Sequence, residues 1–401
     1  MWITNASIVD VRTGSVREGR AVEVVDGLIA AETESAPGAT GEIDLRGAFL
    51  LPGLVSVHTH LSVVYPFSDT DEAEPSWLTV LRSLRRAEDA LRAGVTTLRC
   101  VHEQHRAELL LREAARRSLV RVPRIFGAGR AVSTTGGHGH GMACAYADGA
   151  DEFLKAARTE LAAGADHVKI FITGGIADVC ESLGAQMTGD EMAAAVTAAV
   201  EHGTYVVAHA GSADAIRVAL AAGVRCFEHA YELDAETAQA MRHAGAYLTP
   251  TLCVTRSPEW MADHHFSREQ IERALEVGPR HLDSIRRAID AGVPLLNGTD
   301  YPPGEPIDDT VVAVRELELM VEAGLSPLAA LQGATTIPAS LLGGADDFGA
   351  VEVGLAADLV SVPRNPLEDV TALRGIDLVL QGGRVVRDDR GDLDDRDRRP
   401  R

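Results

Sequence analysis

Short apolar runs alternate with amphipathic stretches along most of the chain. The first clear run, LPGLVSVHTHL at residues 51–61, is rich in strand-forming side chains and includes a proline–glycine pair that marks its start. Between successive runs lie segments such as SADAIRVALAAG, which have helical spacing and end at a glycine. The runs that we interpret as strands are residues 51–58, 95–100, 121–129, 167–175, 204–210, 224–230, 246–251 and 293–300.

This alternation predicts an α/β fold. Near-continuous apolar strands separated by amphipathic helices are typical of a parallel sheet that is covered by helices. Eight such units over about 290 residues fit a (β/α)8 TIM barrel, which we place at residues 51–344. The two ends, residues 1–50 and 345–390, instead hold short β segments, and we expect them to form a small β-sandwich-like domain. Residues 391–401 are dominated by charged side chains, so we expect a disordered tail.

The charge of the chain bears on its partners. It has 38 basic and 59 acidic residues, a net charge of −21 and a pI near 5.1. A field of that sign repels nucleic acid and anionic membranes, so we expect neither as a partner and a small-molecule substrate instead. We find no secretory signal, no apolar stretch of membrane-spanning length and no CxxC pair among the five scattered cysteines. We therefore expect a cytoplasmic protein with reduced thiols.

Side chains that can bind metal or move protons lie in or follow several of the predicted strands. Side chains alternate faces along a strand, so His58 and His60 point the same way at the end of the first one. Barrel active sites lie at the carboxyl ends of the strands, where six such residues converge. Each alone has an ordinary explanation, since a rim histidine can be hydrogen-bonded, a strand lysine can snorkel and an aspartate can cap a turn. Together they predict one site, made of His58, His60, Lys169, His209, His229 and Asp300.

Several motifs are shared with a known group of enzymes. Nearly the whole chain is spanned by PGLVSVHTHL, STTGGHGHGMA, HVKIFITGG, VVAHAGSADAIRVALAAGV, FEHAYELD, GTD and the closing ATTIPASLLG with FGAVEVGLAADLVSV. With these motifs the sequence resembles the amidohydrolase superfamily, in particular its prolidase-like and imidazolonepropionase-like metal-dependent hydrolases.

The resemblance implies a centre with two divalent metal ions. In the lysine-containing members the fourth-strand lysine, here Lys169, is carboxylated and bridges both ions. The other ligands implied are His58, His60 and Asp300 for one ion and His209 and His229 for the second. Imidazole and carboxylate donors suit zinc, and two dications would repel an unmodified ammonium. A metal-bridging hydroxide would attack the scissile carbonyl, with Asp300 as general acid and base.

Other residues are implied to contact the substrate. The glycine-rich loop after the third strand carries His138 and His140, and the resemblance makes His140 a hydrogen-bond donor to the oxyanion, with His138 as a second candidate. Tyr231 matches a tyrosine that holds the substrate's α-carboxylate in the prolidase-like members. We expect the loop at residues 252–260 to form part of the leaving-group pocket. The ordinary alternatives are an exposed loop with two surface histidines and a rim tyrosine.

Three functions remain open at this point. The first is a dinuclear hydrolase that cleaves an amide next to a free carboxylate, as an Xaa-Pro dipeptidase or an N-acyl amino acid hydrolase does. The second is a hydrolase of a cyclic amide, a lactone or a xenobiotic amide on the same scaffold. Imidazolonepropionase itself has no use for Lys169, because its chemistry resembles a single-metal site. The third is a scaffold without activity, which the six filled ligand positions argue against. We expect the first, in a homo-oligomer.

Overall fold

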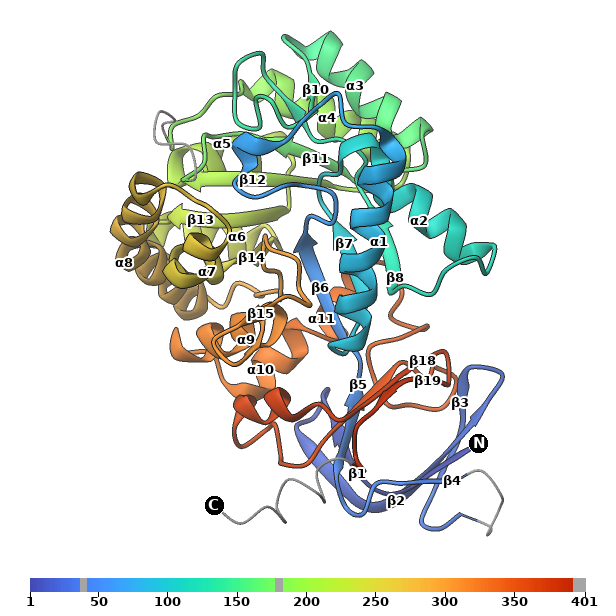
Figure 1. Ribbon diagram of the computed structural model, residues 1–401. Helices are drawn as coiled ribbons and strands as arrows, with labels where there is room; N and C mark the ends of the chain where they lie inside the picture. Colours follow the sequence, from blue (N-terminus) through green and yellow to red (C-terminus); the bar gives the residue numbers. More distant parts are fainter. Residues whose placement is uncertain (37–41, 177–182, 392–401) are drawn as a thin grey trace.

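The barrel and a β-rich part lie at opposite ends of the molecule (Figure 1). The structure is a computed structural model that describes residues 1–36, 42–176 and 183–391. The predicted TIM-barrel-like fold with a β-rich part built from both termini is confirmed. The predicted disordered tail, apart from Gly391, lies outside the described residues, as does Cys180. The other four cysteines are buried and free.

Parallel strands form the barrel in two sheets, with the orders β6–β7–β8 and β10–β9–β11–β12–β13–β14. The third predicted strand, residues 121–129, contains β8, which pairs with β7, and the short strand β9 that follows it pairs instead with β11 in the other sheet. The bounds are β6 Leu54–Thr59, β7 Val95–Cys100, β8 Arg124–Gly127, β9 Val132–Ser133, β10 Ala145–Tyr146, β11 Val168–Phe171, β12 Val206–Ser212, β13 Cys226–Glu232 and β14 Tyr247–Thr249.

The last predicted strand, residues 293–300, closes the barrel without forming a regular ladder. It contacts β14 through an isolated parallel bridge. On its other side the amide of Val57 in β6 donates a hydrogen bond to the carbonyl oxygen of Asn297 at 2.8 Å. Asp300 has a φ of 64°, in the left-handed region, so the extended conformation ends there. The segment therefore lies between β14 and β6 and ends at Asp300.

Helices cover the outside of the barrel (Figure 1). Each buries one apolar face, as α4 does with Met192, Ala195 and Ala199, which follow helical spacing. The bounds are α1 Ser76–Arg92, α2 Ala107–Arg116, α3 Ala150–Ala162, α4 Gly189–Glu201, α5 Ala213–Ala222, α6 Ala235–His243, α7 Pro258–Asp263, α8 Arg268–Ala291, α9 Val312–Glu322, α10 Pro327–Gly333 and α11 Thr336–Leu341. Shorter elements are η1 Phe67–Asp69, η2 Gln104–Arg106, η3 Leu252–Thr255, η4 Val370–Gly375, β15 Pro306–Ile307 and β16 Thr310–Val311.

The β-rich part joins strands from both termini in one eight-stranded sheet. Its order is β19–β18–β17–β5–β1–β2–β3, and β4 also pairs with β1. It has an apolar core of its own, with Ile3, Ile8, Leu50, Leu359 and Leu380 all fully buried. The bounds are β1 Trp2–Asp10, β2 Ser15–Val25, β3 Leu28–Thr33, β4 Glu42–Asp44, β5 Phe49–Pro52, β17 Leu359–Val362, β18 Leu378–Gln381 and β19 Arg384–Asp388.

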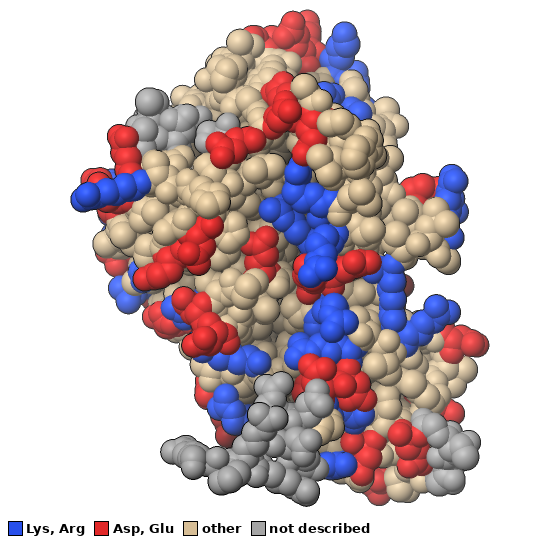
Figure 2. Space-filling model, in the orientation of Figure 1, with Lys and Arg blue, Asp and Glu red and all other residues tan. Residues whose placement is uncertain are grey.

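Acidic and basic side chains are interspersed on the face shown in Figure 2. Arginines of α1 are paired with neighbouring carboxylates, Arg82 with Glu74 at 2.5 Å and Arg85 with Asp89 at 2.8 Å. In the described part of the chain, no helix combines the length and the apolar character that a membrane span needs.

Barrel closure depends on a glycine in the last segment. A Cβ atom at Gly298 would lie 2.8 Å from the backbone nitrogen and 2.7 Å from the Cβ of His58, and 2.5 Å from a methyl group of Thr249. Two neighbouring backbones approach so closely here that no side chain fits between them.

We therefore predict that Gly298→Ala lowers the free energy of unfolding by about 1–3 kcal/mol, the usual cost of overpacking a core. Thermal and denaturant unfolding would measure the change. The matched control is Gly189→Ala at the start of α4, where a Cβ would meet only a methyl group of Val218 at 3.4 Å. Equal stability of the Gly298 variant and wild type would show that the two segments can move apart.

Candidate active site

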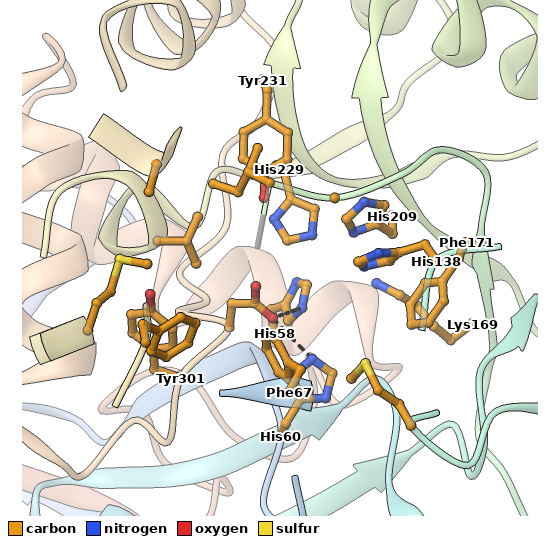
Figure 3. Close-up of a pocket in the computed structure, with 18 residues that line it drawn as sticks. His58, His60, Phe67, His138, Lys169, Phe171, His209, His229, Tyr231 and Tyr301 are labelled. Carbon is orange, nitrogen blue, oxygen red and sulfur yellow. Dashed lines mark hydrogen bonds and ion pairs between the residues drawn. The ribbon is translucent and has the colours of Figure 1, made fainter. Parts of the chain in front are cut away.

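The six predicted ligand residues gather in one cavity at the carboxyl ends of the barrel strands (Figure 3). Eighteen of the described residues line this cavity. Two of the predicted substrate residues, His138 and Tyr231, also line it. The predicted ligands that line it are His58, His60, Lys169, His209, His229 and Asp300.

Three of these side chains converge on one point. The Nε2 atoms of His58 and His60 lie 3.0 and 3.1 Å from Oδ1 of Asp300. Their Nδ1 atoms donate outward, to the carboxylate of Glu228 at 2.5 Å and to the carbonyl oxygen of His102 at 2.9 Å. Burial alone would raise the pKa of Asp300, but the neighbouring His58 and His60 outweigh it and hold this pKa well below its usual value. Two ring nitrogens and an ionised carboxylate could thus hold a metal ion here.

His209 and His229 form the second half of the cluster, with ring centroids 4.5 Å apart. Nε2 of His209 donates to the carbonyl oxygen of Gly174 at 3.1 Å. Nδ1 of His229 donates a hydrogen bond to the hydroxyl oxygen of Thr251 at 2.7 Å. The Thr251 hydroxyl in turn donates a hydrogen bond to the carbonyl oxygen of Pro250. Burial lowers the pKa of both rings well below the usual value, so they are neutral. Each ring keeps one unprotonated nitrogen, the form that binds metal.

Lys169 reaches the same cluster from β11. Figure 3 shows its side chain directed toward the histidines. The side chain is 1 % exposed, and its Nζ atom has no hydrogen-bond partner among the described residues. Burial lowers the pKa of this amine to about 8. A buried amine without a partner is costly, so the site is incomplete around Lys169 without a further group.

Left-handed backbone conformations turn several side chains into the site. In a regular strand Glu228 and His229 would point to opposite faces, yet the Glu228 carboxylate bonds to His58 and the His229 ring lies 5.0 Å from that of His58. His229 has a φ of 67°, which breaks the alternation. Thr251 and Asp300 have φ values of 51° and 64°. Such conformations are strained for residues other than glycine and concentrate at functional sites.

The two histidines of the glycine-rich loop are placed differently. His138 lines the cavity and stacks on His209, with ring centroids 4.2 Å apart. It fits because the neighbouring Gly175 has no Cβ, which would lie 2.4 Å from the His138 ring. His140 is exposed, is not among the residues that line the cavity, and has its ring 6.0 Å from that of Tyr146. The oxyanion role expected of His140 stays a prediction, and its placement does not support it.

Tyr231 lies beside the cluster of predicted metal ligands. Its ring stacks on His229 with centroids 5.1 Å apart and 10° between the planes. No described residue forms a hydrogen bond with its hydroxyl group, which faces the cavity (Figure 3). Burial raises the pKa of this phenol well above its usual value, so the hydroxyl keeps its proton and remains a donor.

The rest of the cavity is mostly apolar. Within residues 252–260, Val254 lines it, and Trp260 stacks on the lining residue Tyr301 with centroids 3.8 Å apart. Among the described lining residues Lys169 is the only lysine or arginine. A charged substrate group therefore meets hydroxyl and metal-ligand groups rather than a guanidinium. The apolar lining residues are Phe67, Met142, Phe171, Ile176, Val254, Met261, Phe266 and Ala274, and Tyr301 adds a second phenol to the wall.

Sequence reasoning missed the residues that support the ligands. Glu228 and Arg99 form a fully buried ion pair, with Nη2 of Arg99 donating to Oε1 of Glu228 at 2.7 Å. A charged residue inside an apolar strand run, in VTTLRC and in FEHA, is the signal that could have found them. His102 and Thr251, which accept from ligand rings, carry no such signal, because their roles depend on loop conformation.

Comparison with known proteins places this geometry in a family. An ochratoxinase from Aspergillus niger is 27% identical over 296 residues, which cover 66% of this chain and 60% of the ochratoxinase, so the match spans less than two thirds of that relative. A prolidase solved with N-methylphosphonate-L-proline has a TM-score of 0.87 and 28% identity, covering 96% of this chain and 99% of the other. A Xaa-Pro dipeptidase with bound methionine has a TM-score of 0.87 and 29% identity, covering 96% and 98%.

The family model matches the whole region that carries the site. It covers residues 49–386, which include the whole barrel and every predicted ligand. The carboxyl-end cavity, the paired histidines of β6 and the aspartate of the closing segment all lie within this match. The chain belongs to the Amidohydrolase family.

Proposed function

We propose that the protein is a metal-dependent hydrolase that cleaves an amide C–N bond next to a free carboxylate, as in Xaa-Pro dipeptides or N-acyl amino acids. The observation that carries the proposal is the hydroxyl of Tyr231, which has no hydrogen-bond partner among the described residues and lies beside the candidate ligands in a mostly apolar cavity. Two similar structures add support, because the proline derivative and the methionine bound in them both carry an α-carboxylate.

The donor set fits two divalent ions, and zinc suits its imidazole and carboxylate groups. We assign His58, His60 and Asp300 to one ion and His209 and His229 to the other. The partnerless Nζ of Lys169 supports its carboxylation, which would turn a buried amine into an oxygen donor between the two halves of the cluster. When bound, such ions lower the pKa of a shared water molecule and polarise the substrate carbonyl.

The remaining steps fall to side chains of the cavity. Asp300, whose pKa is held low, accepts the proton of the attacking water and passes it to the leaving nitrogen. We assign the hydrogen bond to the oxyanion to His138, since this is the loop histidine that lines the cavity. The hydroxyl of Tyr231 donates a hydrogen bond to the substrate carboxylate, and the apolar wall around Val254 and Met261 receives the part of the substrate that carries this carboxylate.

Lys169→Ala tests the metal centre. Wild type should hold close to two divalent ions per chain by elemental analysis, whereas the variant should lose ions together with activity because the bridging donor is gone. A short carboxylic acid should restore part of the activity by occupying the vacated space. Full activity and two ions in the untreated variant would show that Lys169 is only structural.

His138→Ala and His140→Ala test which loop histidine serves the oxyanion. Removing one such donor lowers kcat by about 100- to 1,000-fold, so we expect that loss for His138 and a change below about threefold for His140. Metal content of both variants controls for damage to the neighbouring His209. The opposite ranking, with metal content intact, would return the role to His140.

Tyr231→Phe tests the substrate class. The assay compares Xaa-Pro dipeptides and N-acyl amino acids with their carboxamides. Loss of one hydrogen bond to a charged group costs about 1.5–3 kcal/mol, so kcat/KM on the acids should fall about 10- to 150-fold. The carboxamides should lose far less, and phenylalanine preserves the ring stacked on His229. Equal losses on both sets would mean that Tyr231 does not bind a carboxylate and would favour a cyclic or xenobiotic amide substrate.

A further inference from the structure

A fully buried ion pair lies directly behind one of the metal-ligand histidines. Glu228 and Arg99 are both 0 % exposed, and Arg99 is among the largest side chains that the fold buries completely. Oε2 of Glu228 accepts a hydrogen bond from Nδ1 of His58 at 2.5 Å, and its Oε1 accepts one from Nη2 of Arg99 at 2.7 Å. The carboxylate therefore connects β13 to a ligand on β6 and to a cation on β7.

Arg99 is itself held from several sides. Its Nε donates to the backbone carbonyl of Val57 at 2.6 Å, and its Nη1 lies 3.1 Å from Sγ of Cys226. Val57 directly precedes His58, so the same guanidinium fixes the strand that carries the ligand and the carboxylate that orients its ring. The position of Glu228 is thus set by three barrel strands, its own β13 and the paired strands β6 and β7, rather than by a flexible loop.

Stability does not explain such a pair. The interior of a (β/α)8 barrel is normally filled by branched apolar side chains, and a buried ion pair is often no more stable than apolar residues of similar size. Among the six candidate ligands, His58 is the one that forms a hydrogen bond with the pair in the described structure, and Lys169 interacts with it only electrostatically. Its retention inside the barrel is therefore better explained by what it does to His58.

His58 differs from the other ligand histidines in its outer partner. The rings of His60 and His209 donate to backbone carbonyls, and that of His229 donates to a hydroxyl. Among the described ligand rings, only that of His58 donates to a carboxylate. A carboxylate acceptor fixes the tautomer of a ligating histidine and makes the ring a stronger donor to the metal.

We propose that Glu228, held by Arg99, is a positioning residue for the metal centre: it keeps the proton of His58 on Nδ1 and strengthens the bond of Nε2 to a metal ion. The inference rests on the metal site of the proposed function. It adds a role for two residues that contact neither substrate nor metal.

Glu228→Gln tests the proposal through metal affinity. Zinc uptake by the metal-free protein is measured in competition with a coloured chelator, which needs no substrate. Loss of such an outer partner lowers metal affinity about 10- to 100-fold, and we expect that range for Glu228→Gln. Activity at saturating zinc should largely recover, whereas a folding defect would not be corrected by zinc.

The matched control is Glu160→Gln. Glu160 is also a buried carboxylate between arginines, Arg106 at 2.6 Å and Arg130 at 2.9 Å, but it lies on α3 and contacts no ligand. The zinc affinity of the Glu160→Gln variant should stay within about twofold of that of wild type. If wild type binds zinc and Glu228→Gln binds it equally well, the positioning role is overturned while the proposed function stands. If wild type takes up no zinc, the proposed function and this inference both fail.

A second measurement does not depend on the folding of a Glu228 variant. Long-range ¹H–¹⁵N spectra of the zinc-loaded wild type report which ring nitrogen of each histidine carries the proton, and His58→Asn identifies the signals of His58. We expect the proton of His58 on Nδ1. A proton on Nε2 would overturn the proposal.

Discussion

The backbone carbonyl of His58 accepts hydrogen bonds from the amides of Thr299 and Asp300, at 2.9 and 3.1 Å, and the candidate site depends on this junction. It joins the first barrel strand to the closing segment, so that His60 and Asp300, 240 residues apart, come within 3.1 Å. The hydroxyl of Tyr65 donates to the carbonyl of Asp300 at 2.9 Å and holds the aspartate from its other side. The carboxylate is therefore aimed by backbone hydrogen bonds on rigid elements, which is how a site keeps a fixed geometry.

The sequence predicts the barrel and the gathering of the six candidate ligands in one cavity, because both follow from short-range patterns. Strand periodicity places His58 and His60 on one side, and the rule that strand ends meet at one face gathers the remaining ligands. The path of the glycine-rich loop does not follow from such a pattern. Whether His138 or His140 turns inward depends on the space that Gly175 leaves on a neighbouring segment, which is a tertiary contact.

The buried ion pair that holds the His58 ring could not be predicted from the sequence, because it also depends on a tertiary contact. Arg99 and Glu228 are 129 residues apart, and their pairing depends on how β7 and β13 face each other across the barrel. The sequence pattern shows that Arg99 and Glu228 are each a charged residue in a buried strand, but it does not show that they pair with each other. Burial alone would raise the pKa of Glu228, but Arg99 and His58 outweigh it and keep this pKa below its usual value. Each buried charge is thus tolerated only because another, distant in sequence, neutralises it.

The same electrostatic balance explains why a phenol suits the substrate side of this cavity. Under the proposed function, an arginine placed there would attract a carboxylate strongly, but it would also be repelled by the two divalent ions that we assign to the site. The hydroxyl of Tyr231 carries no net charge and keeps its proton, because burial raises its pKa. Under the proposed function, the metal ions attract an anionic substrate and the hydroxyl of Tyr231 discriminates between substrates. A substrate without a hydrogen-bond acceptor at this point would leave the buried hydroxyl unpaired. A carboxylate would be preferred over a carboxamide because its hydrogen bond to the hydroxyl is charge-assisted.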